Sequence, residues 1–200
     1  MKLLNVLLGI IILIVSSNIQ AALFNRNNGM IYDDVLNITW LADAGLARSE
    51  ITAGINWETA NVWASKLEFG GYTDWRLPSM DVNNDGVIVS CTSVNDELGC
   101  RDNEYRYMFR YNEIQMDMPG DFINIGTNHY WSETENPLFP GLAYLTNMST
   151  GFMGTTSKIT INRNAWAVRD GDVAAVPVPA SFYLFITGLA GLFGWQKNYK

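Results

Sequence analysis

The sequence of 200 residues is short of the residue types that catalytic and metal centres usually need. It has one histidine, His129, and two cysteines, so a zinc site or a serine–histidine pair has almost no candidate residues. The common signatures of hydrolases, metalloproteases and phosphate-binding loops are absent. We therefore expect a protein that is not an enzyme. A glycosidase-like pair of carboxylates stays open as an alternative, because the chain has 20 acidic residues.

Positive charge is also scarce. Acidic residues outnumber basic ones 20 to 13, which gives a net charge of −7. Nucleic acid is therefore a poor candidate partner, because proteins bind it mainly by neutralising its phosphates. Three of the basic residues lie in the two ends of the chain, so the segment between them is more acidic still.

The first 21 residues have the organisation of a secretory signal peptide. One lysine is followed by an apolar run of about a dozen residues and then by small residues up to Ala21. We predict a signal peptide over residues 1–21, cleaved after Ala21. The alternative is an uncleaved membrane or amphipathic helix, but the apolar run is short for a membrane span.

The C-terminal end contains three further segments. Residues 174–180 contain Pro177 and Pro179 and predict an extended linker, because proline fixes φ and keeps its predecessor out of a helix. Residues 181–195 carry no charge and predict an apolar transmembrane helix, and residues 196–200 form a basic tail that suits the cytoplasmic side. A buried C-terminal helix of the globular domain is the alternative.

This end of the chain closely resembles the PEP-CTERM sorting signal, in which a proline motif precedes an apolar helix and a basic end. The motif here is Val176-Pro177-Val178-Pro179. The resemblance implies recognition by an exosortase-type membrane protease in a Gram-negative bacterium. It also implies an intermediate tethered to the inner membrane, followed by release or display at the cell surface or in the extracellular matrix.

Residues 22–173 form one candidate domain, without repeats or a long linker. Helix-like periodicity comes first and strand-like alternation later, which favours an α+β fold with helices packed on an antiparallel sheet. The expected helices run from 55 or 56 to 69 and, capped by Asp102, to about 112. The expected strands are 30–33, 36–41, 129–134, 142–148, 158–162 and 165–170.

The segment 70–78, GGYTDWRLP, is the most distinctive in the domain. Strand periodicity predicts that Trp75 and Leu77 point into the core and that Arg76 points the other way. A guanidinium between such residues is usually held by a carboxylate or by carbonyl groups. Recognition of a ligand by Arg76 is the alternative.

With four other motifs, at 32–45, 57–67, 129–135 and 164–172, this segment resembles the C-terminal domain of the bacterial collagen-like adhesin, the Lcl C-terminal family. The similarity covers roughly residues 30–172. It implies a C-type lectin-like fold with two helices, a small antiparallel sheet and long loops. The family signature, read as mainly structural, falls on Trp75, Arg76, Leu77, Pro78, Trp131 and Trp166.

An insertion after the signature fits the calcium-loop pattern D-x-N-x-D-G, in which oxygen ligands alternate ahead of a glycine. The full loop would need a glutamate where Thr92 stands, and Asp96 or Glu97 is close enough in sequence to replace it. A turn without metal is the alternative, because Asn and Asp often bond their own backbone. The predicted calcium ligands are Asp81, Asn83 and Asp85.

Cys91 and Cys100 are nine residues apart and are the only cysteines. An even number of cysteines in an exported chain favours a disulfide that closes this loop.

Together these features predict an exported surface or secreted binding module, associated with exopolysaccharide or biofilm. Its expected partners are a glycan or extracellular matrix polymer, besides the exosortase-type protease and the membrane. A structural matrix protein without a ligand pocket is the alternative, and an enzyme that acts on polysaccharide is the less favoured one.

Overall fold

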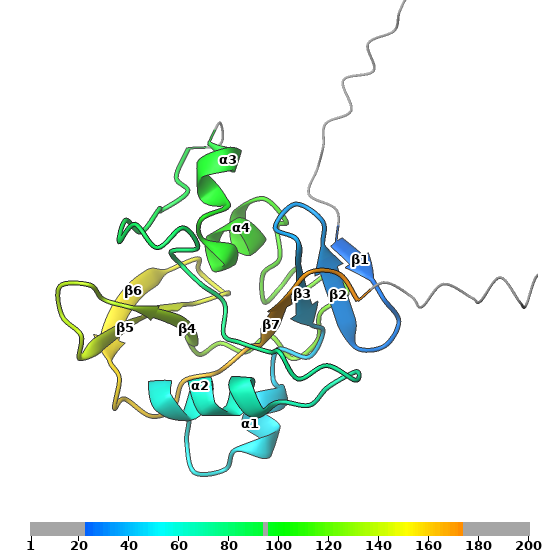
Figure 1. Cartoon of the computed structure of the whole chain (residues 1–200), viewed down its shortest axis with the longest axis horizontal. Helices are drawn as coiled ribbons and strands as arrows, with labels where there is room; N and C mark the ends of the chain where they lie inside the picture. The colour runs from blue at the N-terminus through cyan, green and yellow to red at the C-terminus, as the bar shows by residue number, and fades with distance from the viewer. Residues whose placement is uncertain (1–22, 94–95, 174–200) are drawn as a thin grey trace, which may run out of the picture.

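The computed structural model describes residues 23–93 and 96–173, shown in colour in Figure 1. These residues form a mixed fold of two antiparallel sheets and four helices. The predicted signal peptide (1–21), linker (174–180), apolar helix (181–195) and basic tail (196–200) lie outside the described residues. Within the described part, no helix is long and apolar enough to cross a membrane.

The first sheet joins the beginning of the domain to its end, because the last strand pairs with the third. All its strand pairs are antiparallel. Figure 1 shows the blue strands beside the orange one. In spatial order the strands are β1 (Leu23–Asn25), β2 (Met30–Asp33), β3 (Ile38–Leu41) and β7 (Val168–Asp170).

The second sheet is a meander of consecutive antiparallel strands. The first strand changes register between Trp131 and Glu135. In Figure 1 this second sheet lies on the opposite side of the molecule from β1. The strands are β4 (Tyr130–Glu135), β5 (Leu142–Thr146) and β6 (Met153–Ser157).

Four helices accompany the sheets: α1 (Leu46–Glu50), α2 (Trp57–Lys66), α3 (Glu97–Cys100) and α4 (Glu104–Arg110). As predicted, α2 begins after Asn56, whose side chain accepts a hydrogen bond from the Thr59 amide at 2.8 Å. The prediction that this helix reaches Phe69 is wrong. The chain leaves the helix after Lys66, and Phe69 and Tyr72 pair with each other across Gly70-Gly71.

The second predicted helix is also present, with one correction. Asn103 caps α4 rather than Asp102, because the Asn103 side chain accepts a hydrogen bond from the Arg106 amide at 3.1 Å. The short helices α1 and α3 were not predicted. They have five and four residues, too few to show a helical repeat of apolar positions.

Near the C-terminal side of the domain, one strand prediction fails and another is shortened. Residues 158–162 form turns and bends instead of a strand, and Ile159 and Ile161 are exposed. The alternation of apolar and polar residues in this segment therefore does not correspond to a strand with one buried face. The third strand of the sheet is β6, whose Gly- and Thr-rich sequence gave no signal. The predicted strand 165–170 is shortened to β7, which joins the first sheet.

The fold thus agrees with the expected α+β class but has two sheets where one was expected and four helices where two were expected. The C-type lectin-like fold stays a prediction. Aromatic side chains connect the layers, because the Trp166 ring lies 5.0 Å from Trp40 and 5.1 Å from Phe122, and the Trp40 ring lies 5.8 Å from Tyr105 on α4.

Candidate functional site

The signature segment around Arg76 is part of the core. Trp75 and Leu77 are buried as predicted. Between them, the backbone of Arg76 pairs with Val168 through hydrogen bonds of 2.8 and 2.9 Å, so the segment extends the first sheet beside β7. Pro78 accepts a hydrogen bond through its carbonyl from the Glu133 amide, which ties the segment to β4 as well.

The Arg76 guanidinium is held by carboxylates, as the structural interpretation predicts. It donates to both oxygens of Glu104, at 2.8 and 2.6 Å, and to Asp170 at 2.7 Å. Burial acts against the charge of Arg76, but the hydrogen bonds and charges of these acids outweigh it and raise its pKa. Burial also raises the pKa of neighbouring Glu133, against the opposing effect of Arg76. These contacts occupy Arg76 within the protein.

The two other signature tryptophans are also structural. Both are fully buried, and each indole donates to a backbone carbonyl: Trp131 to Ile55 at 3.3 Å and Trp166 to Leu41 at 2.7 Å. Neither ring is on the surface, where it could stack on a ligand.

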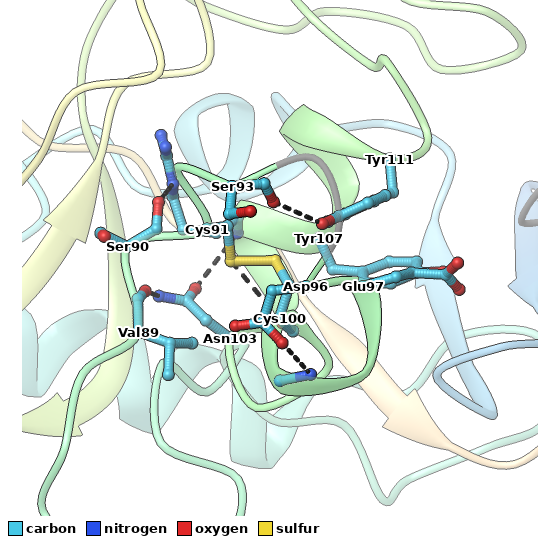
Figure 2. Close-up of a disulfide and its surroundings, with 12 residues drawn as sticks. Val89, Ser90, Cys91, Ser93, Asp96, Glu97, Cys100, Asn103, Tyr107 and Tyr111 are labelled. Carbon is cyan, nitrogen blue, oxygen red and sulfur yellow. Dashed lines mark hydrogen bonds between the residues drawn. A yellow bond between two sulfur atoms is a disulfide. The ribbon is translucent and has the colours of Figure 1, made fainter.

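The predicted disulfide between Cys91 and Cys100 is present, with the two Cα atoms 5.3 Å apart. Both cysteines are buried and pack with Tyr107 of α4. Figure 2 shows the loop held on two sides: the Asn103 side chain donates to the Val89 carbonyl, and the Tyr111 hydroxyl donates to the Ser93 carbonyl. The disulfide therefore ties the loop to the end of α3, and the hydrogen bonds of Asn103 and Tyr111 hold it against α4.

The predicted calcium residues form a tight turn next to this loop. Asp81 accepts hydrogen bonds from the amides of Asp85 and Gly86, and the Asn83 side-chain oxygen accepts one from the Asp85 amide. The third carboxylate of the group is Asp102, and oxygens of Asp81, Asp85 and Asp102 lie within 4.8 Å of one another.

The expectation that Asp96 or Glu97 completes the calcium group is wrong. The Asp96 side chain caps α3 by accepting from the Gly99 amide at 3.1 Å. Glu97 accepts from Arg101 at 3.0 Å and from the Tyr107 hydroxyl at 2.9 Å. Carboxylates are the ligands that calcium prefers, but the backbone bonds of Asp81 also account for the turn without metal. Calcium binding by this loop stays a prediction.

A separate pocket of about 430 Å³ lies between α1 with the loop that follows it and the segment 162–164, which precedes the buried Trp166. The volume falls in the range of about 300–1,000 Å³ that is usual for small-molecule sites. The walls come from three parts of the chain, and most of the lining side chains are polar. The lining residues are Arg48, Ile51, Thr52, Gly54, Ile55, Asn128, Asn162, Arg163 and Asn164.

Sequence reasoning missed this pocket. The only signal was the run Asn162-Arg163-Asn164, which places a cation between two amides just before a buried stretch. His129, next to Asn128, is half-buried, and its ring meets Phe152 edge-on with the ring centres 5.5 Å apart. Burial and then the charge of Arg163 lower the pKa of His129, which favours the neutral ring at pH 7.

A family model matches most of the chain. The family model described as the Lcl C-terminal domain matches residues 29–169, which is more than two thirds of the chain and includes every signature residue described above. No curated protein matches the chain. The chain therefore belongs to the Lcl C-terminal domain family.

Proposed function

We propose that this protein is an exported binding module of a Gram-negative bacterium that attaches to a glycan or extracellular matrix polymer at the cell surface or in a biofilm. Membership of the Lcl C-terminal domain family supports the general part of this proposal, namely that the domain is extracellular and related to adhesion. The buried disulfide suits that compartment, because disulfides persist in oxidising surroundings. The C-type lectin-like fold belongs to this proposal too.

The polar pocket carries the proposal that the protein has a defined ligand. Its lining combines guanidinium, amide and hydroxyl groups from Arg48, Asn128 and Thr52 with the apolar side chain of Ile51. Amides and hydroxyls both donate and accept hydrogen bonds, which suits a ligand rich in hydroxyl groups. A purely structural matrix protein would not need such a cavity.

We also propose that the protein is not an enzyme. Arg76 of the signature and the buried Glu104 are bound to each other through two hydrogen bonds. Among the described residues, the side chain of His129 forms no hydrogen bond with a serine or threonine hydroxyl, so the arrangement of a nucleophile and its base is not supported.

The route to the surface is the remaining part of the proposal. The Val176-Pro177-Val178-Pro179 motif and the apolar segment after it support sorting by an exosortase-type protease. Replacing Pro177 and Pro179 together by alanine in the source bacterium should leave the protein in the membrane fraction with its tail attached. Release as in the wild type would contradict exosortase sorting.

A polysaccharide array probed with the purified full chain tests the binding function. We expect retention on a subset of glycans, and a repeat with a chelator shows whether calcium is needed. Absence of any retained glycan, together with altered biofilm in a deletion strain, would favour the structural matrix protein. Release of sugar products, abolished by one carboxylate substitution, would establish an enzyme instead.

A further inference from the structure

The pocket gathers cations that have no carboxylate partner. Ion pairs engage five basic residues of the described part of the chain: Arg26, Arg76, Arg101, Lys158 and Arg169. Lys66, Arg106 and Arg110 form no salt bridge with a described residue, but they lie outside this pocket. Arg48 and Arg163 form no salt bridge with a described residue, and none of the residues that line the pocket is acidic. In a protein with 20 acidic and 13 basic residues, this is a local region of positive charge.

Two residues that line the pocket also have buried polar atoms without a partner. Asn164 is 3% exposed, and its Oδ1 has no hydrogen-bond partner among the described residues. The Nε of Arg163 is likewise buried without a partner. Buried polar groups are nearly always hydrogen-bonded, so an acceptor and a donor remain to be satisfied at this site.

The walls are fixed by backbone hydrogen bonds. The Ile55 carbonyl accepts from the Arg163 amide at 3.4 Å and from the Trp131 indole at 3.3 Å. The Asn164 amide donates to the His129 carbonyl at 2.8 Å, and the Asn164 carbonyl accepts from the Trp131 amide at 3.0 Å. A pocket held in this way needs little ordering when a ligand binds.

We propose that this pocket binds a sugar acid, with its carboxylate on the guanidiniums of Arg48 and Arg163 and a hydroxyl group donating to Oδ1 of Asn164. The inference rests on the proposed glycan-binding function and names the class of glycan. Guanidinium groups bind carboxylates through paired, charge-assisted hydrogen bonds. The amides of Asn128 and Asn162 provide donors and acceptors for the other hydroxyl groups. A negatively charged protein can thus hold an acidic sugar through one local cationic pocket.

Two polymers with the same backbone test the inference: polygalacturonate and its highly methyl-esterified form, which lacks the charge. Binding of the purified full chain to each is measured at physiological salt, which screens long-range attraction. We expect polygalacturonate to bind at least about tenfold more tightly, the effect of losing one good charged contact. Arg48→Gln and Arg163→Gln should each weaken binding about five- to tenfold.

Arg110→Gln is the matched control, because Arg110 is exposed on α4 and outside the pocket. It removes the same charge and should leave binding unchanged, and circular dichroism should show all three variants folded. Equal binding of the two polymers, or equal weakening by Arg48→Gln and Arg110→Gln, would overturn the inference. If the protein binds neutral glycans but not polygalacturonate, the sugar-acid pocket is refuted and the proposed function stands. If it binds no glycan, both are refuted.

Discussion

Removing the Glu104 carboxylate tests whether the signature arginine is structural. Glu104 is 2% exposed and accepts three hydrogen bonds, two from Arg76 at 2.8 and 2.6 Å and one from the Ser79 amide at 2.7 Å. Glu104→Ala removes all three and leaves the buried Ser79 amide without its acceptor.

The size of the expected loss in free energy of unfolding follows from the burial of Glu104. Breaking a buried ion pair by deleting one partner costs about 3–5 kcal/mol. The Arg76 side chain is 26% exposed and keeps Asp170 at 2.7 Å, so we expect the cost to be smaller. Glu104→Ala should therefore lower the free energy of unfolding by about 2–4 kcal/mol. Glu104→Gln keeps an acceptor for Ser79 and should cost less.

Asp170→Asn is the control, because Asp170 also accepts from Arg76 but its side chain is 78% exposed. Exposed ion pairs contribute about 0–1 kcal/mol, so this variant should be close to wild type. Urea unfolding with an unchanged m-value measures both changes. Equal costs for Glu104→Ala and Asp170→Asn, or a cost below about 1 kcal/mol for the former, would refute the structural role of the pair.

Three further predictions concern pH, redox state and metal. The hydrogen bond from Arg169 lowers the pKa of Asp74, so the pair stabilises the fold above the unfolded pKa of about 4 and that contribution is lost as the pH falls through the folded pKa. Urea unfolding should show the difference between wild type and Asp74→Asn shrinking as the pH falls below the unfolded pKa of about 4, and a constant difference would contradict the linkage. Replacing Cys91 and Cys100 by serine should lower the free energy of unfolding by about 2–3 kcal/mol, and an unchanged value would show that the loop closure stabilises nothing. The calcium hypothesis predicts that millimolar Ca²⁺ raises the Tm of the wild type and that Asp81→Asn abolishes this increase. A wild-type Tm that is the same with and without Ca²⁺ would reject the hypothesis.

Local patterns were sufficient to predict several elements. Asn56 at the start of α2, with the buried Ala60 and Ala64 four residues apart, has both a capping residue and a helical period. The opposite orientations of Trp75 and Arg76 follow from strand alternation. In each of these, the determining interactions are close in sequence.

The remaining features depend on contacts between distant segments. Glu104 and Asp170 lie 28 and 94 residues from Arg76, so the sequence predicted a carboxylate partner without identifying it. Asp102, and not the expected Asp96 or Glu97, lies with Asp81 and Asp85, and the Asp96 side chain caps α3 instead. The pocket is built from three separate segments, and no single one shows a cavity.

The most direct test of export is to measure the mass and the thiol oxidation state of the native protein recovered from the source bacterium. Intact-mass spectrometry of protein recovered from the cell surface and culture medium should show loss of residues 1–21 and of the apolar C-terminal segment, with Cys91 and Cys100 oxidised. Recovery from the cytosol with both ends intact and both thiols reduced would contradict the account.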